Sequence, residues 1–93
     1  MKREYTEKIV HLERTGAIKL LIFLSEHEEA KIWDLTNLSG VSQPAVYRVM
    51  PVLKELGLVE ERVDPPRRLF RITEKGKRVL EKLKEIEEIL GEE

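Results

Sequence analysis

Apolar residues at helical spacing predict two helices in the first third of the chain. Tyr5, Ile9 and Leu12 recur at this spacing and indicate a short N-terminal helix within residues 1–14. A second helix, AIKLLIFLSEH, begins shortly after Thr15, which is a suitable N-cap. This second helix is rich in apolar residues, so we expect it to be largely buried. Its apolar positions are Ile18, Leu21, Ile22, Phe23 and Leu24.

Two further helices are predicted on either side of Gly40. The segment KIWDLTNLSG is apolar at every third residue from Ile32 and ends at Gly40, a residue suited to the position just after a helix. The next helix has Ser42 as its N-cap, is apolar along one face and is closed by Gly57. The apolar positions are Ile32, Leu35 and Leu38 in the first of these helices and Val46, Val49, Leu53 and Leu56 in the second.

A hairpin and a last helix complete the chain. LVEERV and RRLFRI are strand candidates around DPPR, where Asp64 before two prolines is typical of a turn. Thr73 is the N-cap of the last helix, EKGKRVLEKLKEIEEIL. From residue 15 onward the order is helix, helix, helix, hairpin, helix. The pattern therefore predicts one domain over residues 1–93, of class α+β and mostly α.

The third and fourth predicted helices have the spacing of a helix-turn-helix motif, with a tight turn through Gly40 between them. With Ile32 counted as the first position, the core contacts and the turn glycine of the motif fall on suitable residues. These are Leu35, Gly40, Val41, Val46 and Val49. Thr36 stands where the motif usually has Ala. The hairpin that follows makes the predicted fold a winged helix-turn-helix, with a two-stranded wing and a core over residues 15–78.

The segment VSQPAVYRVMPVLKELGLVEE, followed by RRLFRITEKGKRVL, resembles the DNA-binding core of ArsR/MarR-type winged-helix transcriptional regulators over roughly residues 16–80. SQPAV and LKELGLVE are especially ArsR-like, and ITEKG is the usual join between the wing and the last helix. The resemblance implies that the helix after the turn enters the major groove of double-stranded DNA and that the wing reaches the backbone or the minor groove. Position by position, it assigns Ser42, Gln43, Tyr47 and Arg48 to the groove and Arg62, Arg67 and Arg68 to the wing.

A helical wheel of the helix after the turn, here called the recognition helix, also places Tyr47 and Arg48 on the side that faces outward. When the apolar positions point inward, the outward face carries Pro44, Tyr47, Arg48, Pro51 and Glu55. Arginine can bond a guanine edge bidentately, and glutamine can bond adenine in the same way. Tyr47 can contact the DNA or simply pack on Pro51, and the sequence leaves both open. Because proline removes a helix hydrogen bond, Pro51 predicts a helix that curves on its solvent side.

The net charge of −1 hides an uneven distribution. Residues 62–78 hold seven basic residues against Asp64 and Glu74, which gives +5. The seven are Arg62, Arg67, Arg68, Arg71, Lys75, Lys77 and Arg78. A local basic patch is the electrostatic footprint expected of a nucleic-acid-binding protein. A solvated charged surface gives the same pattern and is the alternative.

Composition also bears on the source of the protein. Charged residues make up 38% of the chain, well above the usual quarter. Asn37 and Gln43 are the only side-chain amides in the sequence, and cysteine is absent. Many Glu, Lys and Arg with few thermolabile residues are typical of proteins that work at high temperature. The composition therefore predicts a thermophilic source, of archaeal type.

The sequence argues against several other classes. It offers no cysteine ligand, no paired metal-binding histidines and no glycine-rich phosphate loop, so we expect no enzyme activity, no cofactor and no metal site. His11 and His27 stand alone, and Trp33 and Phe23 are interpreted as core residues. No apolar run has membrane-spanning length, and the N-terminus lacks a signal-peptide core, so we expect a cytoplasmic protein.

The last helix predicts a homodimer. Val79, Leu83, Ile86 and Leu90 are spaced four, three and four residues apart, which is a heptad seam. The seam continues past the wing, where little of the domain remains to cover it. We therefore expect residues 73–91 to form a dimerisation helix, assisted by the N-terminal helix. Two-fold symmetry would place two recognition helices about one DNA turn apart.

Two other functions stay open from the sequence. One is a winged helix used as a protein-interaction module in a transcription or replication assembly, and the other is a chromatin-coating protein with little sequence preference. An interaction module would carry an acidic or apolar recognition face and a neutral wing. Arg48, Arg67 and Arg68 favour DNA instead.

Overall fold

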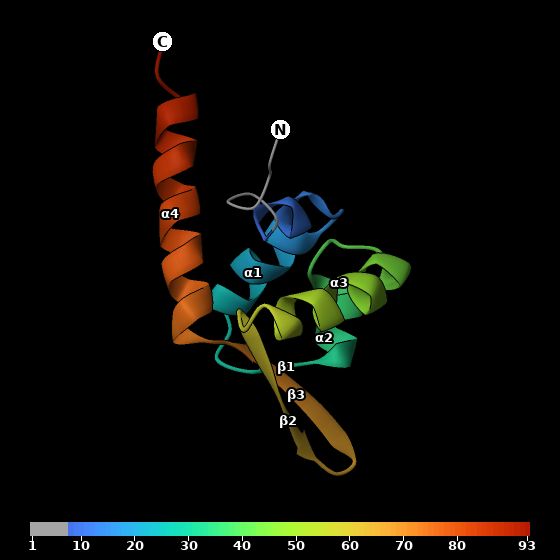
Figure 1. The fold of residues 1–93 in the computed structure, drawn as a ribbon. Helices are drawn as coiled ribbons and strands as arrows, with labels where there is room; N and C mark the ends of the chain where they lie inside the picture. The colour runs from blue at the N-terminus through green and yellow to red at the C-terminus, as the bar shows by residue number, and fades with distance from the viewer. Residues whose placement is uncertain (1–7) are drawn as a thin grey trace.

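The computed structural model describes residues 8–93 (Figure 1). The chain folds into a helical body from which a hairpin projects, and this arrangement confirms the predicted mostly helical α+β winged-helix class. In chain order the elements are the 3₁₀ helix η2 (Ile9–Glu13), α1 (Ala17–Ser25), β1 (Ala30–Lys31), α2 (Ile32–Leu38), α3 (Gln43–Glu55), β2 (Val59–Asp64), β3 (Arg67–Ile72) and α4 (Glu74–Leu90).

Two of the three predicted helix N-caps are confirmed. The Ser42 hydroxyl accepts a hydrogen bond from the backbone N–H of Ala45, and the Thr73 hydroxyl accepts one from Gly76. The prediction of Thr15 was wrong, because Gly16 is the N-cap of α1 and has a φ of 91°. A side chain at Gly16 would also have no room, since its Cβ would lie 2.5 Å from Cγ1 of Val41. Glycine is therefore needed where η2 turns into α1.

The N-terminal segment differs from the predicted α-helix. Tyr5 lies outside the described residues, and the part from Ile9 to Glu13 is a 3₁₀ helix. Short isolated segments often take this tighter form, and here the extended backbone of Arg14 ends it after five residues. Leu12 packs against the core, whereas Ile9 is exposed.

The sheet has a third strand that the sequence did not predict. Its order is β1-β3-β2, and both pairings are antiparallel. β1 contributes two residues, with Ala30 opposite Phe70 and Lys31 opposite Leu69. A strand of two residues is too short to show the alternation that identifies strands in a sequence. Its effect is to fix the start of α2 against the base of the hairpin.

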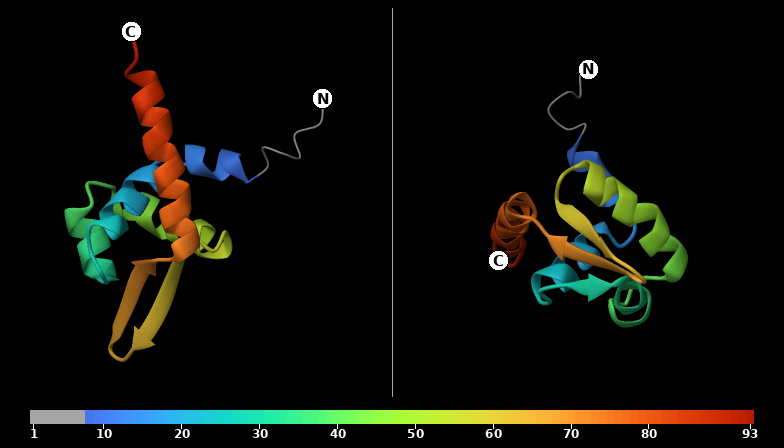
Figure 2. Two further views of the ribbon diagram at one scale, coloured as in Figure 1. Left: turned by 90° about the vertical axis from the view of Figure 1, so that its left-hand side faces the viewer. Right: turned by 90° about the horizontal axis from the view of Figure 1, so that it is seen from below.

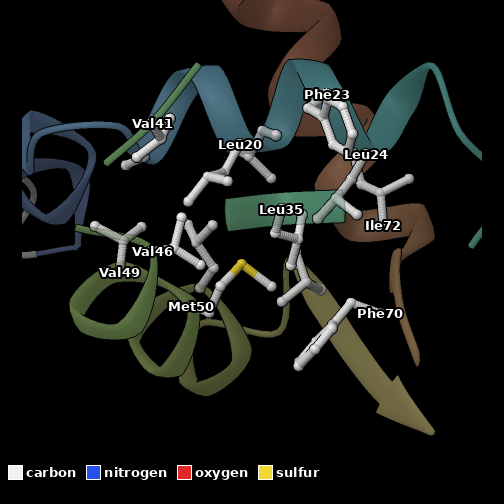
Figure 3. Close-up of a cluster of buried hydrophobic side chains, with 14 of the residues drawn as sticks. Leu20, Phe23, Leu24, Leu35, Val41, Val46, Val49, Met50, Phe70 and Ile72 are labelled. Carbon is white, nitrogen blue, oxygen red and sulfur yellow. The ribbon is translucent and has the colours of Figure 1, made fainter. Parts of the chain in front are cut away.

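The core lies between α1, α3 and the base of the sheet (Figure 3). Leu20 and Leu24 of α1 face Val46 and Met50 of α3, and Phe70 of β3 closes one side. Four residues predicted to be apolar core positions are exposed instead: Ile18 and Ile22 on α1, and Trp33 and Leu38 on α2. Both helices carry more apolar residues than their single packed face can bury, and Trp33 is 60% exposed.

The last helix and the hairpin leave the body in different directions (Figures 1 and 2). The first turns of α4 pack on α1, and Leu80 is buried there. Gly76 lets the start of α4 lie close to the segment between α3 and β2, because a Cβ at this position would lie 2.2 Å from the carbonyl oxygen of Leu58. The remainder of α4 extends beyond the body. None of the helices within residues 8–93 is long and apolar enough to cross a membrane.

Candidate nucleic-acid interface

The outer face of α3 carries the residues that the helical wheel placed there. Pro44, Tyr47, Arg48, Pro51 and Glu55 are all exposed, and Tyr47 is 52% exposed although it is large and partly apolar. Gln43, which the family resemblance assigned to the groove, is exposed as well. α3 is one continuous helix through Pro51, which lies on the solvent side. The helix therefore presents a polar and aromatic surface that makes no part of the core.

Ser42 lies at the N-terminal end of this face, and its side chain also caps the helix. Its hydroxyl is the N-cap acceptor of α3, at 3.4 Å from the backbone nitrogen of Ala45. Ser42 is also exposed, so the side chain can be approached from solvent. Gln43 and Pro44 follow in the first turn, and Pro44 suits this position because it has no backbone N–H that would need a partner.

A groove of about 290 Å³ separates α3 from the hairpin. Tyr47, Pro51 and Lys54 line it from α3, and Arg68 and Phe70 line it from β3. The structure thus brings Tyr47 and Arg68 together, two residues that the sequence placed on separate elements. Tyr47 and Pro51 share this groove wall.

The groove also contains Glu61, an acidic residue that the sequence analysis missed. Its carboxylate accepts hydrogen bonds from Lys54 of α3 and from Arg68 of β3. These two hydrogen bonds lower the pKa of Glu61 from 4.5 to about 2, the bond from Arg68 having the larger effect. Strand alternation could have revealed this residue, because Glu61 lies in phase with the buried Val59 and so faces inward.

Arg62 lies on the other face of the hairpin and is engaged by acidic residues. Its guanidinium is 3.1 Å from Glu29 and 3.9 Å from Asp64, and the hydrogen bond with Glu29 raises the pKa of Arg62. Arg71 is paired with Glu60. Much of the positive charge that residues 62–78 carry in the sequence is therefore balanced locally by acids from elsewhere in the chain.

Arg48 and Arg67 differ from these arginines. Within residues 8–93, no carboxylate lies within 4 Å of either guanidinium, and both side chains are exposed. Arg48 projects from the middle of α3, whereas Arg67 begins β3 beside the hairpin turn. These two cations are free to meet an anionic ligand.

The four residues predicted for a dimer interface fall into two pairs. Val79 and Leu83 are half-buried and pack against the core of their own chain, because α4 lies on α1 at this level. Ile86 and Leu90 are 49% and 75% exposed. Ile89, which the sequence placed beside the seam, is exposed as well. The unpartnered apolar surface of α4 therefore lies on its last two turns.

The side chain of His27 makes its stacking and hydrogen-bonding contacts with Phe23. Its ring stacks on Phe23 at 4.1 Å between centroids, and its Nδ1 lies 2.7 Å from the carbonyl oxygen of Phe23. Among the described residues no group of three or more His, Asp or Glu side chains is arranged to hold a metal ion.

The winged-helix region matches a known family. Residues 14–75 match the sequence model of the family described as "Sugar-specific transcriptional regulator TrmB". This span runs from the end of η2 to the start of α4 and includes the whole hairpin. No curated protein sequence matches the chain.

Solved structures of transcriptional regulators are similar to this chain. The transcriptional repressor BigR from Xylella fastidiosa aligns over 97% of this chain and 89% of its own, with 25% identity and a TM-score of 0.72. A MarR-family regulator from Silicibacter pomeroyi aligns over 84% of this chain and 55% of its own, with 26% identity and a TM-score of 0.71.

A transcriptional regulator homologue from Pyrococcus horikoshii OT3 covers 98% of this chain and 100% of its own, with 24% identity and a TM-score of 0.69. The similarity to these structures confirms the winged helix-turn-helix fold. It also agrees, at a coarse level, with the ArsR/MarR resemblance. The matched family and these structures are described as transcriptional regulators.

Proposed function

Because the chain belongs to the TrmB family of transcriptional regulators, we propose that it binds double-stranded DNA with sequence specificity, with α3 in the major groove and the hairpin on the backbone or in the minor groove. The observation that carries this proposal is that Arg48 on α3 and Arg67 at the hairpin turn are both exposed and have no carboxylate within 4 Å among residues 8–93. Free guanidinium groups are the side chains best suited to guanine edges and phosphates.

The proposed contacts divide by chemistry. Gln43 and Arg48 on the exposed face of α3 are proposed to form hydrogen bonds with base edges. Tyr47 is proposed to contact a thymine methyl group or a sugar. Ser42, at the N-terminus of the same helix, is proposed to contact a phosphate. On the hairpin, Arg67 is the principal backbone contact, while Arg68 extends the positive surface beside Tyr47. Arg62 is the weakest of the candidates, because Glu29 and Asp64 already engage it.

We also propose that the protein acts as a homodimer through the end of α4. The exposed apolar residues Ile86, Ile89 and Leu90 lie on the part of α4 that extends beyond the body. Exposed apolar patches on otherwise charged surfaces are typical of interaction sites. A two-fold contact here would cover them with the same residues of a second copy, and it would present two α3 helices to one duplex.

Selection from a random DNA library tests the DNA-binding function. The wild-type protein should enrich a defined sequence from duplexes that carry a randomised stretch, and the enriched duplex should bind tighter than the unselected library at the same salt concentration. Binding with equal affinity to all duplexes would indicate a DNA-coating protein. Absence of binding at low salt would favour the protein-interaction module.

Two further proposals follow from composition and function. A DNA-binding regulator works where the DNA is, so we propose a cytoplasmic location. The highly charged, amide-poor composition supports a thermophilic source. A melting temperature in the ordinary mesophilic range, about 45–65 °C, would contradict this second proposal.

A further inference from the structure

Glu61 joins three elements of the candidate interface through one carboxylate. Its Oε1 accepts from Nζ of Lys54 at 2.8 Å, and its Oε2 accepts from Nε of Arg68 at 2.5 Å. Lys54 lies in the last turn of α3, Glu61 in β2 and Arg68 in β3. The side chain of Glu61 is 9% exposed, whereas those of Lys54 and Arg68 are 49% and 54% exposed. A shielded anion thus holds two half-exposed cations from neighbouring elements.

The chemistry of this bridge resists movement of the hairpin. Both contacts are charge-assisted hydrogen bonds, which are the stronger kind. Glu61 lies on the hairpin and Lys54 on α3, so a hairpin that swung away from α3 would break the charge-assisted hydrogen bond between them, and this loss opposes the movement. Phe70 lies opposite Glu61 in the sheet, and its ring supports the Arg68 guanidinium at 5.6 Å.

DNA recognition would depend on this geometry. Arg48 of α3 and Arg67 of the hairpin can act together only if one duplex meets both at once. A hairpin held in place before binding avoids the entropy cost of ordering it during binding. We propose that Glu61 is a positioning residue for DNA recognition, which fixes the hairpin against α3 so that base contacts and backbone contacts form on the same duplex. This inference rests on the DNA-binding function proposed above.

Glu60 provides a matched control. It is the neighbour of Glu61, carries the same charge and also pairs with an arginine of β3, but it does so on the opposite face and without a contact to α3. If the two carboxylates acted only by repelling phosphates, Glu60→Gln and Glu61→Gln would strengthen binding to every duplex. A positioning role predicts a different result for Glu61 alone.

The test compares dissociation constants for the enriched duplex and for the unselected library, at one fixed salt concentration, by fluorescence anisotropy. Glu60→Gln should leave the ratio of the two constants unchanged. Glu61→Gln should lower the preference for the enriched duplex about tenfold, while binding to the library is unchanged or stronger. Glutamine keeps the size of the side chain, but one amide oxygen cannot neutralise two cations. Partial unfolding leaves the ratio intact, because it weakens binding to both duplexes equally.

A wild-type ratio in Glu61→Gln would overturn the inference. If that variant does not fold, Lys54→Met replaces it, because Lys54 is half-exposed and its loss removes only the α3 end of the bridge. Lys54→Met should also lower the ratio, and an equal loss on both duplexes would mean that Lys54 is only a phosphate contact and would overturn the inference. If the wild-type protein enriches no sequence, the proposed function itself is wrong, and the inference with it.

Discussion

Arg67 and Arg68 are neighbours in β3, yet they lie on opposite faces of the hairpin. Arg68 is opposite Val63 and shares its face with Glu61 and Phe70, on the side of α3. Arg67 is opposite Asp64 and lies on the other face, beside the turn. Successive side chains of a strand alternate in this way. Two arginines that look equivalent in the sequence are therefore expected to do different work.

Single substitutions should separate the two. Arg67→Ala should weaken binding to all duplexes alike and reduce the slope of log K against log salt by about 0.9, because one phosphate contact is lost. Its fold stability should change little, since no ion pair within residues 8–93 involves Arg67. Salt titrations followed by anisotropy, with thermal melts beside them, measure both quantities.

Arg68→Ala should additionally lower the free energy of unfolding. It leaves Glu61 with Lys54 as its single cation, so the stabilising hydrogen bond from Arg68 is lost. Equal stability of the Arg67→Ala and Arg68→Ala variants would contradict the separation of roles described here. An unchanged salt slope in both would mean that the hairpin does not touch DNA.

Arg48→Ala tests base recognition by α3. If Arg48 bonds a guanine edge, its loss should cost about 1–3 kcal/mol on the enriched duplex and much less on the unselected library. Lys19→Ala, which removes an exposed cation from α1, is the charge-matched control and should affect neither duplex. Equal losses on both duplexes in Arg48→Ala would reassign this residue to a phosphate contact.

The lowered pKa of Glu61 predicts a pH dependence of stability. Because the folded-state pKa is about 2 and the unmodified value is 4.5, the contribution of Glu61 is complete above about pH 4.5 and is lost as the pH falls toward 2. Wild type should be more stable than Glu61→Gln by roughly 1–2 kcal/mol at pH 7, since Lys54 and Arg68 are half-exposed and solvent screens them.

Urea denaturation at about pH 7, 5.5 and 2.5 gives this difference at each pH. The difference between the two proteins should be the same at the two higher pH values and should shrink at the lowest. Glu60→Gln should show a smaller difference at neutral pH, because the carboxylate of Glu60 is itself half-exposed. A difference for Glu61→Gln that does not vary with pH would contradict the ion-pair explanation.

Ile86→Glu tests the homodimer. The substitution would bring two carboxylates, one from each copy, into an apolar contact, so the dimer should dissociate while each protomer stays folded. Val63→Glu makes the same kind of chemical change at an exposed apolar residue of the hairpin and should leave the oligomeric state unchanged. Sedimentation equilibrium distinguishes the two. If Ile86→Glu sediments like a wild-type dimer, the interface lies elsewhere.

Leu83, which lies in the middle of the predicted seam, should respond differently from Ile86. Leu83 is half-buried against the core of its own chain, so Leu83→Glu should lower the melting temperature as well as affect assembly. Of the predicted seam, Val79 and Leu83 pack against the protomer core, whereas Ile86 and Leu90 are exposed. A melting temperature equal to that of Ile86→Glu would show that Leu83 contributes nothing to the protomer.

The sequence determined the elements that depend on local interactions. The bounds of β3 and α4 agree with the predicted segments, and the outward face of α3 carries Tyr47 and Arg48 as the helical period required. Caps, turn residues and periodicity act within a few residues, so a linear pattern can reveal them.

Only the tertiary structure decided what lies beside what. Arg62 pairs with Glu29, which is 33 residues away, and Glu61 meets Lys54 and Arg68 from two other elements. The tertiary structure also leaves Trp33 exposed, because α2 buries only one face and Trp33 does not lie on that face. Of the basic residues that give residues 62–78 a charge of +5, Arg62, Arg68 and Arg71 pair with acids from outside that block, whereas Arg67 has no such partner within residues 8–93. This distribution follows from packing, which joins residues that no local pattern connects.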